Sequence, residues 1–227
     1  DKEDFGLRCD ELMISNDAVI GWYGYSGSGK STLAKIVTGI LPYPEDSIET
    51  DLSSEEIIYV PQFAERFLYS GDLQQMFDLL AVRPEFNAGS FHKNLKIVTT
   101  HLDLKLEKYE NRSLWKVSAG ELRRLILSIA LALKPKLLIL DEPTINMSEE
   151  NTRQIAGIFS GDLVSAIICI SHDYRFLKKN TDAGVYFDAG EVSQIHSWKD
   201  LEQKYHYIQN NVFEKKIEKH YAGAMNS

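Results

Sequence analysis

The sequence predicts an α/β protein with a mostly parallel sheet at its core, and three observations support that prediction. A short apolar run, 19–23, leads into a glycine-rich turn, and the apolar stripe of a helix follows it. Two later runs, 137–140 and 164–170, are apolar almost throughout, which is typical of strands buried on both faces. Helix-like segments stand between these runs, so the strands are expected to pair in parallel.

The remaining elements are assigned from residue spacing and turn signals. Residues 5–23 predict two or three strands separated by a turn at 15–17, and 55–60 predict a strand that Pro61 and Gln62 close. Helices are expected from Lys30, at 73–80 and 91–102, from about 118 to 134, and from about 148.

The distribution of helix-like segments along the sequence also predicts how the chain is divided into domains. Helix-like segments dominate 63–115, which predicts an inserted helical subdomain between the two parts of a core, 1–62 and 116–200. A C-terminal tail, 201–227, carries apolar residues at near-helical spacing, so we expect a helix that packs on the core or on a partner.

The composition is that of an ordinary soluble globular protein. Of the 227 residues, 44% are hydrophobic and 26% are charged. No apolar run approaches the ~20 residues that a membrane-spanning helix needs, and no signal-peptide pattern is found, so a cytosolic location is expected. The formal net charge of −8 argues against broad nucleic-acid binding, and no direct DNA binding is expected. Cys9 and Cys169 are expected to be small buried hydrophobic residues, and the histidines lack metal-ligand spacing.

The glycine-rich turn has the spacing of a phosphate-binding loop, G-x-x-x-x-G-K-[ST]. Its backbone N–H groups can converge on one anion, and the following helix adds unpaired N–H groups and the positive end of its dipole. Lys30 is expected to reach the β- and γ-phosphates of a triphosphate, Ser31 to hold Mg²⁺, and Thr32 to contact the phosphate nearer the ribose. The pattern is short enough to occur by chance, so residues downstream must support it. The loop comprises Gly24, Tyr25, Ser26, Gly27, Ser28, Gly29, Lys30, Ser31 and Thr32.

Two later strands end in residues suited to phosphoryl transfer. Asp141 follows four apolar residues, so its carboxylate is expected at a strand end facing the phosphate loop, where it would hold Mg²⁺ with Ser31. Glu142 is placed to take a proton from an attacking water. His172 follows 164–170 and is expected near the γ-phosphate. Alone, these residues also fit a strand-ending turn with solvated acids and a satisfied turn histidine, but their order in the chain favours catalysis.

A fourth feature, Ser118-Ala119-Gly120-Glu121, precedes the amphipathic helix that begins near 118. Ser-x-x-Glu at this position is a capping box, which would stabilise the helix whatever the protein does. A capped helix start beside a glycine is also an anion site, so both interpretations can hold.

Five motifs in one order resemble those of the ATP-binding cassette (ABC) ATPases, over about residues 5–195. They are 24–32, Gln62, 117–121, 137–142 and 171–173. The resemblance implies a P-loop NTPase fold of the ABC type, with a small antiparallel β subdomain beside the parallel core and an inserted helical subdomain. It also implies an enzyme that binds ATP with Mg²⁺ and hydrolyses it.

The resemblance further implies a head-to-tail dimer, in which each ATP lies between one copy's phosphate loop and the other copy's 118–121 motif. Ser118 and Gly120, flanked by Ala119 and Glu121, would then bind the γ-phosphate of the partner's ATP. In each copy Gln62 would sense Mg²⁺ and the attacking water. Glu142 would be the catalytic carboxylate and His172 the switch histidine.

The chain departs from the family pattern in three places. Residues 118–121 read Ser-Ala-Gly-Glu where the family usually has Ser-Gly-Gly-Gln. Ile145-Asn146 stands where a Leu-Asp pair is usual, and the missing aspartate puts communication between the two ATP sites in doubt. No aromatic residue lies between Phe5 and Trp22, so the adenine-stacking residue is either Phe5 or missing.

Three functions are compared on these grounds. The first is the ATPase subunit or domain of an ABC transporter, held at the cytoplasmic face of a membrane by a membrane-spanning partner. The second is a soluble ATPase of the ABC-F or ribosome-associated type, which 118–122 and 171–177 resemble, although those branches carry two cassettes and this sequence has no internal repeat. The third, a chromosome-maintenance head, needs a coiled coil between Gln62 and Ser118 for which that segment is too short. The single cassette and the acidic charge favour the transporter.

Overall fold

The structure, a computed structural model, describes residues 6–9, 12–43, 48–63, 71–83, 86–110, 112–145, 147–159, 164–195, 198–199 and 201. Its strands are β1 (Arg8–Cys9), β2 (Val19–Gly24), β3 (Ile57–Val60), β4 (Leu137–Asp141), β5 (Ala166–Ile170), β6 (Ala183–Asp188) and β7 (Glu191–Ile195). Its α-helices are α1 (Lys30–Val37), α2 (Leu73–Ala81), α3 (Ala88–His101), α4 (Ala119–Ala132), α5 (Glu149–Phe159) and α6 (Tyr174–Asn180). Single 3₁₀ turns are η1 (Ser54–Glu56), η3 (Leu106–Lys108) and η4 (Leu114–Lys116).

Within the described residues, the strands form one seven-stranded sheet in the order β1-β7-β6-β2-β5-β4-β3. Every neighbouring pair runs parallel except β6 and β7, which a tight turn joins in antiparallel fashion. The predicted α/β fold with a mostly parallel sheet is therefore confirmed. The antiparallel part is the β6–β7 ladder, which continues the same sheet in this part of the chain.

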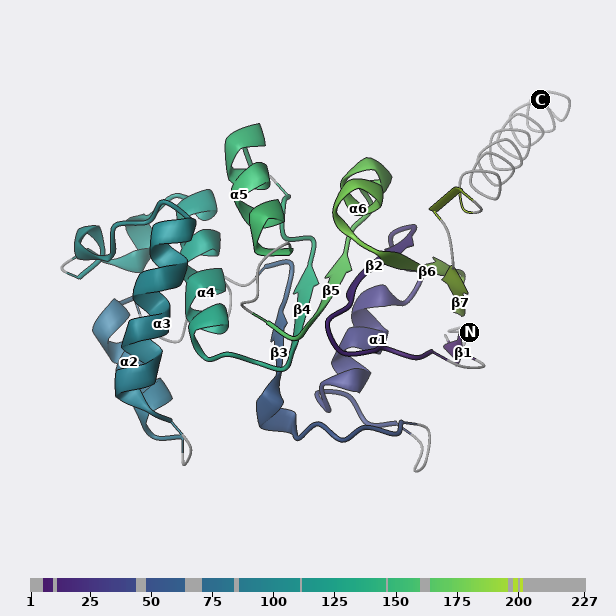
Figure 1. Cartoon of the computed structure of the whole chain (residues 1–227), viewed down its shortest axis with the longest axis horizontal. Helices are drawn as coiled ribbons and strands as arrows, with labels where there is room; N and C mark the ends of the chain where they lie inside the picture. The colour runs from purple at the N-terminus through teal and green to yellow at the C-terminus, as the bar shows by residue number, and fades with distance from the viewer. Residues whose placement is uncertain are drawn as a thin grey trace, which may run out of the picture.

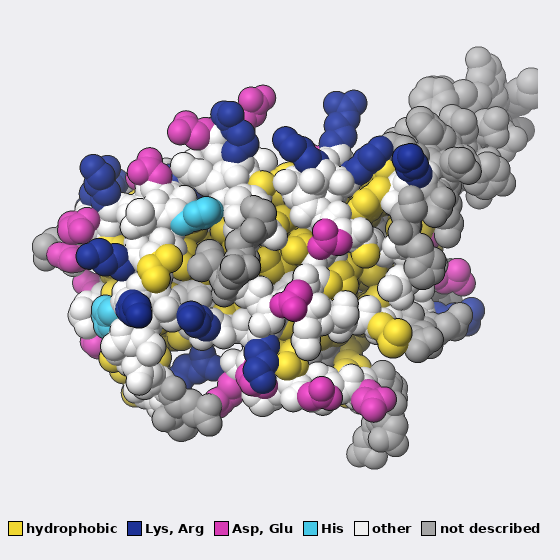
Figure 2. All heavy atoms as spheres, viewed as in Figure 1, with side chains coloured by type: hydrophobic (Ala, Val, Ile, Leu, Met, Phe, Trp, Pro, Cys, Tyr) yellow, Lys and Arg dark blue, Asp and Glu magenta, His cyan; other side chains and the backbone are white. Residues whose placement is uncertain are grey.

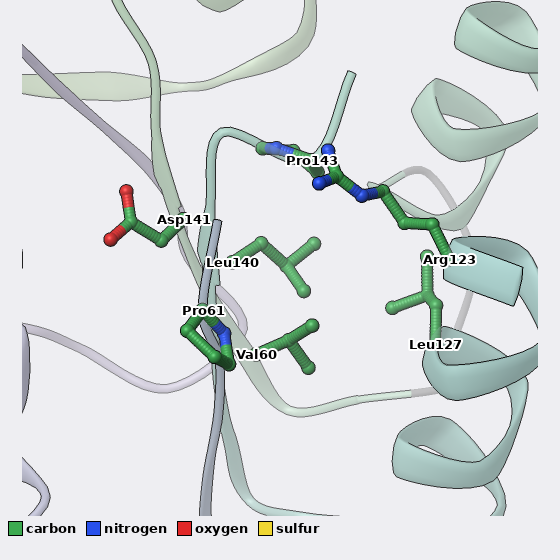
Figure 3. A pocket seen from close by; sticks show the side chains of 7 residues that line it. All are labelled: Val60, Pro61, Arg123, Leu127, Leu140, Asp141 and Pro143. Atoms are coloured by element: carbon green, nitrogen blue, oxygen red, sulfur yellow. The ribbon is translucent and has the colours of Figure 1, made fainter. Parts of the chain in front are cut away.

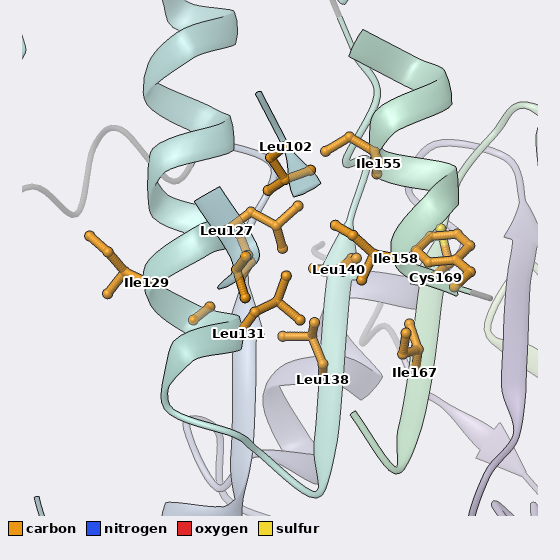
Figure 4. Packing of buried hydrophobic residues seen from close by; sticks show 14 of the residues in the cluster. Leu102, Leu127, Ile129, Leu131, Leu138, Leu140, Ile155, Ile158, Ile167 and Cys169 are labelled. Atoms are coloured by element: carbon orange, nitrogen blue, oxygen red, sulfur yellow. The ribbon is translucent and has the colours of Figure 1, made fainter. Parts of the chain in front are cut away.

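Side chains of the central strands alternate between two hydrophobic cores, because successive residues of a strand point to opposite faces. In β4, Leu138 and Leu140 join the core that helices α3 to α6 cover, whereas Leu137 and Ile139 join the core beneath α1. Figure 4 shows the first core, in which leucines of α4 meet isoleucines of α5 over β4 and β5. Strands with both faces covered explain the uninterrupted apolar runs of the sequence.

The observed elements agree with the predicted ones to within a few residues. Helix α3 begins three residues earlier than expected, at Ala88, because the Asn87 side chain caps it by accepting a hydrogen bond from the N–H of Ser90 at 2.8 Å. The predicted strand from residue 55 starts only at Ile57, since η1 precedes it. The sequence analysis did not predict α6, β6 or β7.

Helices α2 and α3 lie at one end of the molecule, where α3 packs beside α4 (Figure 1). Their buried residues, such as Phe91 and Leu95, belong to the same hydrophobic cluster as Leu138 of the sheet. The division into a core, an inserted helical subdomain and a tail stays a prediction. No helix in the described segments combines the length and apolar character that crossing a bilayer requires.

Both cysteines are expected from the sequence to be buried, and the structure confirms this for only one of them. Cys169 is buried in β5, as expected, but Cys9 is exposed, because β1 is a two-residue strand at the edge of the sheet. Of the predicted tail, Leu201 is described and is 1% exposed, which agrees with packing on the core. Residues 202–227 lie outside the described residues. Figure 2 shows basic and acidic side chains interspersed over the face in view.

Candidate active site

A cavity of about 570 Å³ opens at the carboxyl ends of the central strands. Its walls come from the turn after β2, the start of α1 and the turns after β3, β4 and β5. These segments are far apart in sequence, and the parallel sheet brings them to one edge. The lining residues are Tyr23, Gly24, Tyr25, Ser26, Gly27, Gly29, Lys30, Ser31, Thr32, Gln62, Asp141, Glu142 and His172. Most of the residues predicted to act on ATP are therefore together.

The glycines of the loop are required by its geometry. A Cβ atom on Gly24 would lie 2.3 Å from the carbonyl oxygen of Phe187, so no other residue fits where β2 passes β6. Gly27 and Gly29 have φ angles of 82° and 106°, which side chains disfavour. Gly29 is the N-cap of α1 and no side chain caps this helix, so its first N–H groups are available to an anion.

In this structure the Lys30 side chain folds back onto the backbone of the phosphate-binding loop. Its Nζ donates to the carbonyl oxygens of Gly24 and Tyr25, each at 2.7 Å, and lies 3.4 Å from Oγ of Ser28. Burial lowers the pKa of Lys30, while the carboxylates of Glu142 and Asp141 act in the opposite direction. Ser28 is buried beneath the loop and is absent from the cavity wall, unlike the other predicted loop residues.

Glu142 is held in a strained and fully bonded position. Its φ angle is 49°, a left-handed value that costs a non-glycine residue about 1–3 kcal/mol. The carboxylate accepts hydrogen bonds from Oγ of Ser171 at 3.1 Å and from the backbone N–H of His172 at 2.9 Å. Nδ1 of His172 lies 2.8 Å from the same carboxylate. Glu142 is 8% exposed, so its buried carboxylate connects the turn after β4 to the turn after β5 through these hydrogen bonds.

Asp141 has a partner that the sequence analysis missed. The hydroxyl of Tyr59, on β3, donates to Oδ2 of Asp141 at 2.8 Å. Burial and the Asp141 carboxylate raise the pKa of Tyr59, while a hydrogen bond from Ser31 acts in the opposite direction. Tyr59 therefore stays protonated and contacts Asp141 and Ser31, two of the three residues predicted to hold Mg²⁺. Its signal in the sequence is a tyrosine in the apolar strand that precedes Pro61 and Gln62.

The donor set fits a magnesium triphosphate. Within the described residues, no group of three or more His, Cys, Asp and Glu side chains could hold a metal ion on its own. Mg²⁺ at nucleotide sites is held by one or two protein oxygens together with phosphates and water. Ser31, Gln62 and Asp141 supply oxygen atoms in the same cavity wall, beside the N–H groups at the start of α1.

The 118–121 motif lies apart from this cavity. Ser118 is the N-cap of α4, and its Oγ accepts from the N–H of Glu121 at 3.3 Å and donates to the Glu121 carboxylate at 2.8 Å. The predicted helix cap is thus confirmed. Ser118, Ala119, Gly120 and Glu121 are all absent from the described residues that line the cavity. Two further candidates, Phe5 and Asn146, lie outside the described residues.

Comparison with known proteins identifies the family to which a chain with this site belongs. The sequence model of the ABC transporter family matches residues 7–145. The chain belongs to the ABC ATPase family. ATP hydrolysis is the characteristic activity of this family, so the protein is an ATP-binding enzyme of the ABC type.

Individual ABC proteins align with most of the chain. An uncharacterized ABC transporter ATP-binding protein of Methanocaldococcus jannaschii is 30% identical over 200 residues, which cover 80% of this chain and 76% of that protein. The zinc import ATP-binding protein ZnuC of Wigglesworthia glossinidia brevipalpis is 29% identical over 177 residues, or 75% and 71% of the two chains. The solved structure of cbiO1 from Clostridium perfringens, part of the ABC transporter complex cbiONQ, has a TM-score of 0.68 at 23% identity, covering 90% of this chain and 87% of that one. The ABC fold is therefore shared along nearly the whole length of the cassette.

Proposed function

We propose that this ABC ATPase works as a head-to-tail dimer that encloses two Mg-ATP and drives a membrane-spanning transporter partner. One observation carries the proposal. The cavity at the strand ends gathers the phosphate loop, Gln62, Glu142 and His172, whereas the capped start of α4 lies outside it. A single chain thus presents one half of a phosphate site in the cavity and a second anion-binding surface elsewhere.

Each residue has a role in the proposed reaction. When bound, Mg-ATP supplies a γ-phosphoryl group for transfer to water. Glu142 accepts the proton of the attacking water at its carboxylate, which Ser171 and His172 hold in place. His172 and Gln62 line the same cavity and would lie near the γ-phosphate, and Ser31, Asp141 and Gln62 would hold Mg²⁺.

Lys30 and the loop amides bind the β- and γ-phosphates, and Thr32 contacts the phosphate nearer the ribose. To do so, the Lys30 ammonium exchanges its hydrogen bonds to Gly24 and Tyr25 for bonds to phosphate oxygens. Ser118 and Gly120, with Ala119 and Glu121, supply donors to the nucleotide bound by the other copy.

The proposed partner follows from the relatives. ZnuC is named as a zinc import ATP-binding protein, a phytoplasma relative 26% identical over 199 residues is named as an energy-coupling factor transporter ATP-binding protein, and cbiO1 belongs to a transporter complex. By analogy, this chain would sit at the cytoplasmic face of a membrane through its partner. Purification from membranes with a multi-spanning protein supports this assignment, whereas purification with ribosomes favours the soluble alternative.

Mixing two inactive variants tests the shared site. Lys30→Ala disables the phosphate loop of one chain, and Gly120→Glu places a negative charge on the α4 start of the other. A Cβ on Gly120 meets nothing closer than Nδ2 of Asn151 at 3.7 Å, so this variant is expected to fold. A mixed dimer then retains one intact site, formed by Lys30 of one chain and Gly120 of its partner. Activity that returns only on mixing supports the proposal, and a mixture as inactive as its components refutes it.

The ATP-bound dimer can also be trapped directly. Glu142→Gln removes the base while the phosphate loop is left intact, so Mg-ATP is expected to bind without cleavage. Size-exclusion chromatography with light scattering should then show a dimer with Mg-ATP and a monomer without it. Lys30→Ala in the same background should remain monomeric. A Glu142→Gln chain that stays monomeric with bound ATP contradicts the sandwich arrangement.

A further inference from the structure

A single arginine of α4 holds the two loops that carry Gln62 and Glu142. Arg123 lies in the second turn of this helix, and its Nη2 donates to the carbonyl oxygen of Gln62. Its Nη1 donates to the carbonyl oxygen of Glu142 at 2.9 Å and lies 3.4 Å from that of Ile145. Figure 3 shows the side chain extending from α4 towards Pro143, on the opposite side of β4 from Asp141.

The packing beneath Arg123 is tight enough to keep the guanidinium in place. A void of about 10 Å³ is all that remains between the arginine and the side chains below it, which are Val60, Pro61, Leu127 and Leu140. This is about the room that the centre of one water molecule needs, so Arg123 packs closely over these apolar side chains. The planar fork of arginine suits two acceptors on different segments, which a lysine ammonium cannot match.

The accepting carbonyls belong to residues whose side chains line the nucleotide cavity. Gln62 follows β3, Glu142 follows β4, and both residues line the cavity at the carboxyl ends of the strands. A displaced carbonyl moves the Cα atom of its own residue and therefore the side chain. Glu142 is the more sensitive of the two, since its left-handed φ angle persists only where neighbours enforce it.

We propose that Arg123 is a positioning residue that couples α4 to the catalytic loops of its own chain. The proposal rests on the proposed function, in which the start of α4 contacts the nucleotide held by the partner. Arg123 keeps Gln62 and Glu142 in place relative to α4, beside the chain's own nucleotide. This link runs through backbone carbonyls and includes Ile145, next to the position where the family's usual aspartate is missing.

The variant that tests the link is Arg123→Met, which keeps the length and apolar stem of the side chain and removes the guanidinium. The mixed dimer with one intact site gives the assay. In that dimer the Gly120→Glu chain supplies the working Lys30, Gln62 and Glu142, while the Lys30→Ala chain supplies only its α4 surface. Arg123→Met in the Gly120→Glu chain is expected to lower kcat about 10- to 100-fold with KM within about threefold, as for misplaced catalytic groups.

The same change in the Lys30→Ala chain is expected to leave kcat within about threefold, because the Gln62 and Glu142 of that chain are idle. Equal losses in both positions, or a loss only in the Lys30→Ala chain, overturn the proposal, since they indicate that Arg123 merely stabilises α4 or the dimer. Arg123→Lys in the Gly120→Glu chain should recover little activity, because Arg123 reaches the two loops with two different nitrogens, whereas lysine has only one. Full recovery by lysine also contradicts the proposal.

The adjacent Arg124 provides a matched control. It is half-buried on the same helix, but its guanidinium bonds to the carbonyl of Leu102 and to Oε1 of Gln154, away from the cavity. Arg124→Met should lower the melting temperature. Its effect on kcat should be the same whichever chain of the mixed dimer carries the change.

A second measurement does not depend on the mixed dimer. An inactive mixed dimer would count against the dimer arrangement, but the contacts of Arg123 within one chain would still be open to test. In the nucleotide-free chain, Arg123→Met should raise hydrogen exchange at the amides of Glu142 and Ile145 about tenfold relative to Leu138. Unchanged exchange at both amides overturns the proposal.

Discussion

Nδ1 of His172 lies 2.8 Å from Oε1 of Glu142, and the backbone N–H of His172 donates to the same oxygen at 2.9 Å. The histidine therefore contacts the proposed catalytic base twice, once through its ring and once through its backbone. Its side chain is 68% exposed, whereas that of Glu142 is 11% exposed. The ring is thus the part of this pair that a nucleotide in the cavity can reach.

His172→Ala separates these two contacts. The backbone N–H and Ser171 still hold Glu142, so the fold and the affinity for Mg-ATP should change little. Loss of the ring is expected to lower kcat by about 10²- to 10³-fold, the range for removing one group that stabilises the charge of the transition state. Phosphate release measures kcat, and calorimetry on the same sample measures affinity. His92→Ala, an exposed histidine on α3, is the control, and equal rates in the two variants would exclude a role for His172.

Lys30→Ala should weaken nucleotide binding strongly. The ammonium is expected to form charge-assisted hydrogen bonds to phosphates, each contributing about 1.5–3 kcal/mol, so affinity should fall by at least about 10-fold. Lys35→Ala, near the other end of α1, should bind normally. Calorimetry with Mg-ATP gives both affinities, and circular dichroism checks that the loop variant is folded. An unchanged affinity for Lys30→Ala would mean that phosphate binds elsewhere.

Tyr59→Phe tests the support of the predicted magnesium site. The phenol donates to Asp141 at 2.8 Å, and its loss leaves that carboxylate free to turn away from the metal. The Mg²⁺ concentration at half-maximal ATP binding should rise about fivefold, equivalent to the ~1 kcal/mol of one hydrogen bond. Binding of ATP without Mg²⁺ should be unaffected. Tyr43→Phe, at an exposed position after α1, provides the comparison, and the same Mg²⁺ requirement in both variants would rule out this support.

Much of the fold and site could be predicted because local patterns determine them. Asp141 follows an apolar run that is typical of a strand with both faces covered, and Lys30 follows glycines with the spacing of an anion-binding turn. In a parallel sheet the carboxyl ends of such strands share one edge, so their residues come together without further information.

The residues that could not be predicted act through pairings across the sheet or between layers. Tyr59 reaches Asp141 because β3 lies beside β4, a neighbour relation that no local pattern encodes. Arg123 stands in the sequence as one of two consecutive arginines on an amphipathic helix, which is typical of a solvated face. Its contacts depend on the angle at which α4 meets two turns, so only the folded chain distinguishes it from Arg124.

The contact between Trp198 and the sheet provides a prediction about stability. The indole packs over Gly21 and Gly184, which are paired across β2 and β6, and its Nε1 donates to the carbonyl of Thr181 at 3.3 Å. A Cβ on Gly21 would lie 2.8 Å from the ring, so Gly21→Ala must displace it. We expect a loss of about 1–3 kcal/mol in the free energy of unfolding, measured by urea denaturation.

A double-mutant cycle shows whether the indole causes this loss. In a Trp198→Leu background the ring is gone, so the additional cost of Gly21→Ala should shrink by more than about 0.5 kcal/mol, beyond the additivity expected of independent sites. Gly6→Ala is the control, since a Cβ there meets nothing within 4 Å and its cost should be the same in both backgrounds. If Gly21→Ala costs as much without the indole as with it, the loss comes from the contact with Oγ1 of Thr181, which lies 2.9 Å from the same Cβ, and the role of the indole is excluded.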